Sequence, residues 1–170
     1  MIAILESMGA DIRLENERKL GDEPVADIRV RSGVLEGGEI DPGLVSLAID
    51  EFPALFVAAG AARGTTVFSG LAELRVKESD RIAAMAAGLE ALGITVTETS
   101  DGAVIEGGRF TGGTVMSHGD HRVAMSLAIA GTVADAPVVV KDIAAVDTSF
   151  PGFAKLMREI GVAIEVGEQP

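Results

Sequence analysis

The sequence predicts an α/β fold (α+β), in which short strands alternate with helices along one domain. Segments whose apolar residues recur at helical spacing alternate with segments in which apolar and polar residues alternate. A pattern of helix, glycine and strand also recurs along the chain. The 170 residues correspond to about one domain, which buries about two thirds of the surface of its unfolded chain.

The first part of the chain predicts a helix end followed by a hairpin. Residues 2–8 are apolar at helical spacing and stop at Gly9, with no capping residue ahead of them. Residues 10–15 and 25–30 alternate between apolar and polar side chains, as the two strands of a hairpin do. Residues 34–35 predict a third, short strand.

The remaining elements follow from apolar spacing and turn residues. Residues 52–62 are apolar nearly all round and predict a buried helix, with Pro53 in its first turn. Residues 77–92 give the clearest helical periodicity, which Gly93 terminates. Further helices are expected at residues 120–133 and 150–160, and strands at 65–68, 94–98, 103–106, 114–116, 137–140 and 162–166.

An internal repeat is visible in these elements. Three helix ends continue through Gly9, Gly93 or Gly161 into an alternating strand. Asp50 and Asp120 each precede an apolar helix and a strand. We expect one domain over residues 1–170, built of a repeated supersecondary unit, with a truncated first repeat at 1–36 and units at about 37–108 and 109–170. A truncated repeat would make the chain a fragment of a larger fold; a complete α+β domain with coincidental spacing is the alternative.

Composition excludes several classes of protein. The net charge of −12 repels phosphates and argues against a general nucleic-acid-binding surface. The absence of cysteine excludes disulfide scaffolds, zinc–thiolate sites and thiol nucleophiles. No apolar run reaches the roughly 18–20 residues of a membrane span, and the N-terminal residues are too acidic for a signal peptide.

Cations at helix starts are the most unusual feature of the sequence. Lys77 and Arg81 are four residues apart, so they share one face of the helix expected at 77–92, with Glu78 near that face. Cations are disfavoured at a helix N-terminus, where the helix dipole favours anions. A bound phosphate or carboxylate would explain them. A solvated helix start with local ion pairs is an equally good explanation from spacing alone.

Two other expected helix starts carry charged residues. Asp50 and Asp120 are expected to cap helices, and Arg122 repeats the placement of a cation in a first turn. Asp50 would be ionised there and able to accept a proton from a bound hydroxyl. His118 and His121 lie near Asp120, but no third ligand has convincing spacing, so we expect no metal site. If these helix starts meet at one edge of the fold, they form an anion-binding face.

Four segments resemble one enzyme family. IDEFPALFVAAGAARGTT, ELRVKESDRIAAMAAGLEALG, GDHRVAMSLAIAG and DTSFPGFAKLMREIG resemble the C-terminal part of the 5-enolpyruvylshikimate-3-phosphate (EPSP) synthases, or 3-phosphoshikimate 1-carboxyvinyltransferases. The resemblance covers nearly the whole chain. The related UDP-N-acetylglucosamine enolpyruvyl transferases share fold and chemistry but lack the R-V-K-E-S-D-R and D-H-R-x-A-M motifs.

The resemblance implies a fold and a reaction. The fold is one domain of a two-domain protein, an inside-out α/β barrel of βαβαββ units with helices inside and sheets outside. The enzyme transfers the enolpyruvyl group of phosphoenolpyruvate to the 5-hydroxyl of shikimate 3-phosphate and releases phosphate, through a tetrahedral intermediate. This reaction belongs to the shikimate pathway of aromatic amino-acid biosynthesis, is the target of glyphosate, needs no cofactor and takes place in the cytoplasm.

The resemblance also implies roles for five residues. Asp50 matches the proton acceptor that contacts the 5-hydroxyl, and Lys77 matches a lysine that binds shikimate 3-phosphate. Glu78 matches the acid that transfers a proton to the enolpyruvyl carbon. Arg81 and Arg122 match arginines that hold phosphoenolpyruvate.

The sequence departs from the family in two respects. Thr148 stands where some members have a lysine that contacts phosphoenolpyruvate, which resembles the class II, glyphosate-tolerant branch. The basic residues and the Ser-Ser-Gln loop of the family's N-terminal domain have no counterpart here. We therefore expect the chain to be inactive alone and to need the N-terminal domain as its partner. A free-standing domain that binds a phosphorylated ligand without catalysis is the alternative.

Overall fold

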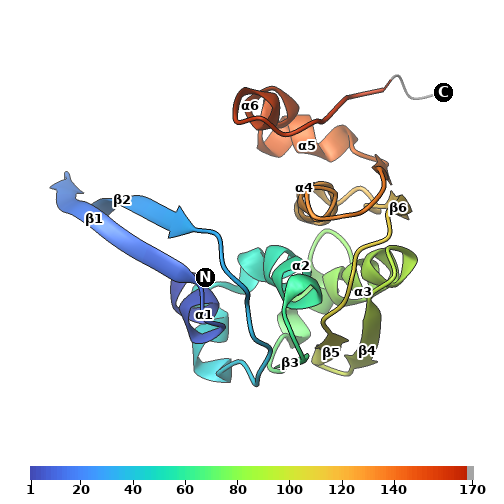
Figure 1. The fold of residues 1–170 in the computed structure, drawn as a ribbon, viewed down its shortest axis with the longest axis horizontal. Coiled ribbons are helices and arrows are strands. Elements are labelled where there is room, and N and C mark those ends of the chain that lie inside the picture. The colour runs from blue at the N-terminus through green and yellow to red at the C-terminus, as the bar shows by residue number, and fades with distance from the viewer. Residues whose placement is uncertain (168–170) are drawn as a thin grey trace.

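The computed structural model describes residues 1–167, and Figure 1 shows its helices and strands. The α-helices are α1 (Ile2–Ser7), α2 (Phe52–Ala61), α3 (Arg81–Ala91), α4 (His121–Ala130), α5 (Ala144–Ser149) and α6 (Phe153–Glu159). The strands are β1 (Asp11–Leu20), β2 (Glu23–Arg31), β3 (Thr65–Phe68), β4 (Thr95–Thr99), β5 (Gly102–Glu106), β6 (Gly113–Met116) and β7 (Val138–Lys141). Three 3-10 helices complete these elements: η1 (Pro42–Leu47), η2 (Ile49–Glu51) and η3 (Ala72–Val76). No helix of the described part has the length and apolar character needed to cross a membrane.

The core lies between three helices. α2, α3 and α4 pack against one another, and sheets lie on the outside of this group (Figure 1). Gly88 on α3 allows close packing, because a Cβ atom there would lie 2.8 Å from Leu127 Cδ2 on α4. On the sheet side, the Phe68 ring of β3 stacks on Phe56 and meets Phe52 edge-on, with centroids 4.9 and 5.8 Å apart. These helices therefore occupy the interior, and most of their apolar residues are buried, although Ile129 on α4 is 37% exposed.

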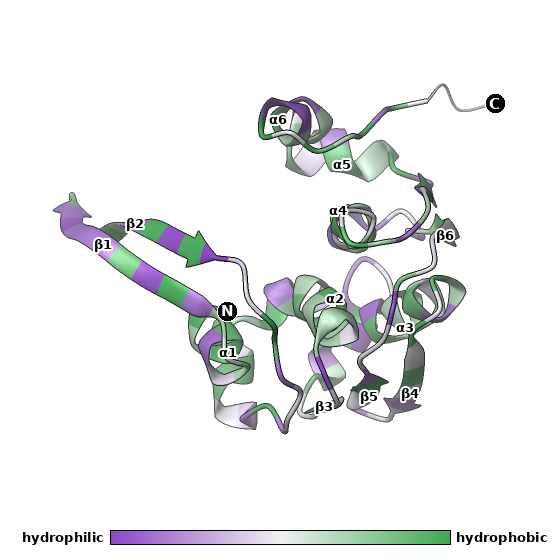
Figure 2. Cartoon of the chain, in the orientation of Figure 1, coloured by the Kyte–Doolittle hydropathy of each residue, from purple (hydrophilic) through white to green (hydrophobic). Residues whose placement is uncertain are grey.

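Within residues 1–167 the strands form three small sheets. β3, β5 and β4 form an antiparallel sheet in that order, whereas β6 and β7 are parallel and joined through α4. β1 and β2 form a separate hairpin that projects from the rest of the molecule (Figure 1). Hydrophilic and hydrophobic residues alternate along residues 11–15 and 27–31 of this hairpin, whereas residues 15–19 are all hydrophilic (Figure 2). This alternation is the pattern that predicted a hairpin here.

Three helix ends are closed by the same backbone hydrogen bonds. Gly9, Gly93 and Gly161 have φ of 90°, 88° and 94°. In each case the N–H of the following residue donates to the carbonyl five residues earlier: Ala10 to Leu5, Ile94 to Leu89, and Val162 to Met157. This is the Schellman arrangement, which needs a left-handed residue and therefore favours glycine. The recurring sequence pattern thus corresponds to a recurring local structure.

Two predicted helices have different limits in the structure. The helix expected at 77–92 begins at Arg81, because the Asp80 carboxylate accepts a hydrogen bond from the Ala83 N–H and caps the helix. The helix expected at 150–160 is broken between α5 and α6. Pro151 disfavours a helical conformation of the residue before it, and Phe150 has φ −137° and ψ 77°.

Two predicted strands are wrong. Residues 34–35 form no strand; the neighbouring Glu36 and Glu39 instead make isolated parallel bridges to Arg63 and Val67. Within the described residues, 162–166 are not paired with any strand, and a strand needs a partner to complete its ladder. The other predicted helices and strands are confirmed with ends that differ by up to three residues, except that β1 continues to Leu20, five residues beyond its predicted end.

We predict that Gly107→Ala destabilises the fold by about 1–3 kcal/mol or more, because a new Cβ atom would lie 1.8 Å from the backbone oxygen of Ala62. The neighbouring Gly108→Ala is the matched control, since its Cβ atom would meet only Ile94 Cδ1, at 3.4 Å. Urea unfolding measures both variants. Equal stability of the two would contradict this account of the packing.

Candidate active site

The Arg81 guanidinium lies at the centre of a charged cluster. Its side chain is only 1% exposed, although it stands at the start of α3. Nε donates to Asp120 Oδ2 at 2.8 Å, Nη1 to Asp50 Oδ1 at 2.9 Å, and Nη2 to Glu78 Oε2 at 2.6 Å. A buried cation is stable only when it is paired and hydrogen-bonded, and three carboxylates satisfy this requirement. The local ion pair with Glu78 that sequence spacing suggested is therefore present, but it belongs to a larger network.

Asp120 joins the start of α4 to this network. Its Oδ1 accepts the backbone N–H of Arg122 at 2.9 Å and of Val123 at 3.3 Å, so the predicted helix cap is confirmed. Its Oδ2 accepts Arg81 Nε and the Ser79 hydroxyl, the latter at 3.1 Å. Burial by itself raises the pKa of Asp120, but the hydrogen bond and charge of Arg81, together with the backbone N–H groups of Val123 and Arg122, outweigh it and hold that pKa below 3.8. The carboxylate is therefore ionised although it is fully buried.

Asp50 lies among three cations. Besides Arg81, its carboxylate has Lys77 Nζ at 3.6 Å from Oδ1 and Arg122 Nη2 at 3.8 Å from Oδ2. Partial burial raises the pKa of Asp50, but the charges of Arg122, Lys77 and Arg81 together outweigh it and keep that pKa below 3.8. The side chain stays 39% exposed. An ionised carboxylate thus faces solvent with cations around it.

The expectation that Asp50 caps a helix is wrong. Asp50 lies inside η2, and α2 begins after Glu51 without a side-chain hydrogen bond at its N-cap. Pro53 in the first turn of α2 has no N–H group, so this helix start has one donor fewer to satisfy. The Asp50 carboxylate therefore bonds to cations rather than to the backbone of its own helix.

The prediction that Lys77 and Arg81 share one helix face is also wrong. Lys77 and Glu78 lie in the loop before α3, because the cap at Asp80 delays the helix. Both cations nevertheless reach Asp50, and the Lys77 ammonium also pairs with Glu73. The hydrogen bond to Glu73 raises the pKa of Lys77, so the amine is protonated at neutral pH. Tertiary structure, not helix periodicity, brings these groups together.

Arg122 connects the start of α4 to η2. Its Nη1 donates to the backbone oxygen of Asp50 at 2.9 Å and lies 3.6 Å from Glu51 Oε1. Its side chain is 34% exposed. The starts of α3 and α4 thus meet η2, which directly precedes α2, an arrangement that the sequence left open. All five predicted site residues belong to one connected cluster.

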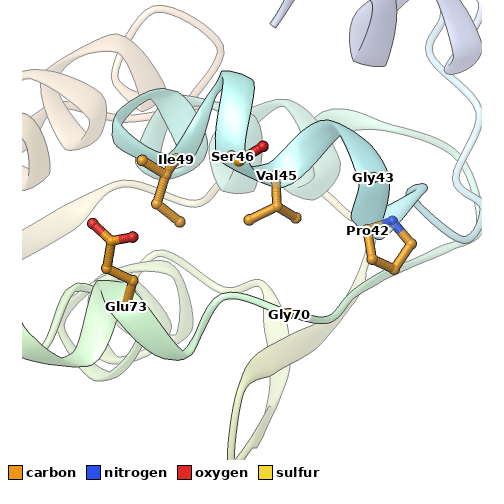
Figure 3. Close-up of a pocket in the computed structure, with 7 residues that line it drawn as sticks. All are labelled: Pro42, Gly43, Val45, Ser46, Ile49, Gly70 and Glu73. Atoms are coloured by element: carbon orange, nitrogen blue, oxygen red, sulfur yellow. The ribbon is translucent and has the colours of Figure 1, made fainter.

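A cavity of about 350 Å³ borders this cluster. It lies between η1 and the segment from Gly70 to Glu73, and its lining includes Val45, Ser46 and Ile49 (Figure 3). Ile49 precedes Asp50 in sequence, and Glu73 holds Lys77. The lining thus includes Glu73, the partner of Lys77, and Ile49, the neighbour of Asp50, while Asp50, Glu78 and Arg122 are partly open to solvent.

Sequence reasoning missed several members of the cluster. Glu73 precedes Lys77 by four residues, a spacing that could have indicated an ion pair. Ser79 and Glu51 carry no comparable sequence signal. For Asp120 the sequence indicated only a cap and not its bond to Arg81. Within residues 1–167 no group of three or more His, Asp or Glu is arranged to hold a metal ion.

We predict that Asp120→Asn destabilises the fold by about 3 kcal/mol, because it removes the buried partner of a buried cation while Asp50 and Glu78 remain. An asparagine side chain still caps α4, so this substitution tests the loss of the negative charge alone. Asp135→Asn is the matched control, since its partner Arg109 is 80% exposed and surface pairs contribute little. Denaturant unfolding at pH 7 compares the variants, and equal losses would refute a special role for Arg81.

The lowered pKa values predict a loss of stability in acid. The unfolded carboxyls bind protons at higher pH than the folded Asp50 and Asp120 do. These two carboxylates therefore stabilise the fold fully above about pH 4, and this stabilisation is lost as pH falls below 3.8. Thermal unfolding between pH 6 and pH 2.5 measures this loss of stability. Asp120→Asn should flatten the decline and Asp135→Asn should not. An unchanged slope in Asp120→Asn would contradict the assignment.

Comparison with known proteins identifies the family. The pattern described as EPSP synthase (3-phosphoshikimate 1-carboxyvinyltransferase) matches residues 1–157. The 3-phosphoshikimate 1-carboxyvinyltransferase of Xanthomonas campestris pv. campestris strain 8004 is 58% identical over 164 residues, which are 96% of this chain and 37% of that protein. That of Xanthomonas oryzae pv. oryzae strain PXO99A is 56% identical over 168 residues, 99% and 38% of the two chains.

The fold agrees with this result. The solved EPSP synthase of Acinetobacter baumannii matches with a TM-score of 0.95 and 49% identity, over 98% of this chain and 40% of that one. The expected inside-out α/β fold is confirmed, with helices inside and sheets outside. The chain spans a little over a third of the length of these curated relatives. It belongs to the EPSP synthase (3-phosphoshikimate 1-carboxyvinyltransferase) family.

Proposed function

We propose that this chain supplies half of an active site that transfers the enolpyruvyl group of phosphoenolpyruvate to the 5-hydroxyl of shikimate 3-phosphate and releases phosphate. The observation that carries the proposal is the convergence of Lys77, Arg81 and Arg122 on the Asp50 carboxylate. An anionic ligand that displaces the exposed Glu78 carboxylate would gain these cations as hydrogen-bond donors. Both proposed substrates are polyanions, and the family supports their identity.

Asp50 and Lys77 are proposed to bind shikimate 3-phosphate. Asp50 is ionised and partly exposed, so its carboxylate is able to accept a hydrogen bond and then the proton of the 5-hydroxyl. The Lys77 ammonium, 3.6 Å from that carboxylate, would donate to an oxygen of the same substrate. Because the Lys77 ammonium and the Asp50 carboxylate lie so close together, both are within reach of one ligand of the size of a sugar.

Arg81 and Arg122 are proposed to hold phosphoenolpyruvate, and Glu78 to exchange a proton with the enolpyruvyl carbon. Glu78 is 51% exposed, whereas Asp120 is fully buried. A substrate carboxylate would therefore displace Glu78 from Arg81 and leave Asp120 in place. When the substrate carboxylate binds the Arg81 guanidinium, this exchange would free the Glu78 carboxyl for proton transfer. Arg122, partly exposed, would contact the same anion.

The rest of the site is proposed to come from the part of the enzyme that this chain does not span. The cluster of Asp50, Glu78 and Arg122 is exposed on one side. Electrostatic stabilisation of a developing charge is strongest where water is excluded, and an open face provides no such exclusion. The chain alone is therefore expected to bind anions weakly and to catalyse no turnover.

The decisive assay measures phosphate release from phosphoenolpyruvate and shikimate 3-phosphate. We expect activity only when the chain is mixed with a separately produced N-terminal portion of a family member. Glu78→Gln should lower kcat about 10²–10⁴-fold, the usual contribution of a proton-transfer group. Glu159→Gln is the matched control, because Glu159 lies in an exposed pair with Lys155.

Other outcomes distinguish the alternatives. Turnover by the chain alone would contradict the half-site proposal. Phosphoenolpyruvate binding without activity in any mixture would favour a non-catalytic ligand-binding domain. Activity with UDP-N-acetylglucosamine in place of shikimate 3-phosphate would assign the chain to the other enolpyruvyl transfer reaction.

A further inference from the structure

Arg75 makes more hydrogen bonds than any role in the proposed chemistry explains. It belongs to η3, two residues before Lys77, and its side chain is 26% exposed. Nε donates to the Ser100 carbonyl at 2.9 Å, Nη1 to Asp80 Oδ2 at 2.8 Å, and Nη2 to Glu98 Oε2 at 3.3 Å and to the Thr99 carbonyl at 2.5 Å. None of these hydrogen bonds joins Arg75 to any of the five proposed site residues.

The loop that carries Lys77 and Glu78 has little backbone support. Among the described residues, Lys77, Glu78 and Ser79 make no backbone–backbone hydrogen bond beyond those within helices and strands. The loop lies between the end of η3 at Val76 and the cap of α3 at Asp80. Its conformation therefore depends on bonds made by side chains, either its own or those at its two ends.

The bond between Arg75 and Asp80 closes this loop. Asp80 uses Oδ1 to cap α3 and Oδ2 to accept from Arg75. One carboxylate thus fixes both the first residue of α3 and the end of η3. Lys77 and Glu78 lie between the two residues of this bridge, so its geometry limits where their side chains begin.

The same guanidinium anchors the loop to the turn between β4 and β5. Glu98, Thr99 and Ser100 all accept from Arg75. Asp101 of that turn binds the other end of the segment, because it accepts the N–H of Gly70 through its carboxylate and that of Leu71 through its backbone oxygen. The turn is thus bonded to the segment on both sides of η3.

We propose that Arg75 is a positioning residue, which holds the Lys77–Glu78 loop against the β4–β5 turn so that Lys77 meets Asp50 and Glu78 meets Arg81. The catalytic role in this inference rests on the proposed function, whereas the placement of Lys77 is independent of that function. Lysine cannot replace Arg75, because an ammonium lacks the planar fork that reaches acceptors on two sides at once. Arg75 acts through Lys77 and Glu78 and touches no substrate.

The first test measures the reactivity of Lys77 and needs no activity. Competitive labelling of the 170-residue chain with acetic anhydride, followed by peptide mass spectrometry, gives the labelling rate of Lys77 relative to Lys155. In the native chain Lys77 is 22% exposed and paired, and Lys155 is 77% exposed, so Lys77 should label slowly. Arg75→Gln should raise this ratio several-fold.

Three further variants separate the position of the loop from the stability of the fold. Asp80→Ser keeps an oxygen that caps α3 but removes the oxygen that Arg75 binds, so it should raise the Lys77 ratio as Arg75→Gln does. Gly107→Ala weakens the fold away from the loop and should leave the ratio unchanged. Arg109→Gln, which breaks an exposed arginine pair, should leave it unchanged too. An unchanged Lys77 ratio in both Arg75→Gln and Asp80→Ser would overturn the proposal.

The second test measures kinetics in the mixture with the N-terminal portion. Arg75→Gln should lower kcat about 10²-fold, because misplacement of a reacting group by about 1 Å has an effect of this size. Arg75→Lys should not restore it. Native kcat in Arg75→Gln would overturn the positioning role. An inactive wild-type mixture would instead overturn the proposed function, and the labelling ratio would then decide the placement of Lys77 by itself.

Discussion

The buried guanidinium of Arg81 is the interaction on which the rest of the site depends. A cation with 1% exposure loses its hydration, so it persists only with carboxylates bonded to it. Its three partners come from η2, from the loop before α3 and from the start of α4. One desolvated charge therefore fixes the relative positions of three segments that are far apart in the sequence. The convergence of helix starts on one face follows from this requirement.

The carboxylates of the cluster fall into two groups with different exposure. Asp120 is fully buried and satisfied on both oxygens, so it serves as the permanent counter-ion of Arg81. Asp50 and Glu78 are 39% and 51% exposed and occupy the outer side of the same guanidinium. This division gives the site a fixed inner part and an outer part that an anionic ligand is able to reach. It also explains how cations accumulate in a chain of net charge −12: each is neutralised locally.

Sequence patterns located most elements because these depend on near neighbours. Apolar spacing placed α2 and α4, and alternation placed the β1–β2 and β4–β5 hairpins. Errors arose where one residue overrode the pattern. Asp80 caps α3 and excludes Lys77 from the helix, and Pro151 interrupts the helix expected at 150–160. The strand expected at 162–166 has the right alternation but no partner among the described residues. Periodicity reports which face is apolar, not whether a neighbouring strand exists.

The sequence by itself determined the fold class, the family resemblance and the five charged residues of the candidate site, because these depend on residue type and local spacing. Only the tertiary structure decided how the charges pair. Arg81 meets Asp120 across 39 positions and Asp50 across 31, and Arg75 finds three of its four acceptors 23 to 25 positions away. Such pairs depend on which groups folding removes from water together. No local pattern encodes that, since the free energy of an ion pair depends on burial and geometry that the whole fold creates.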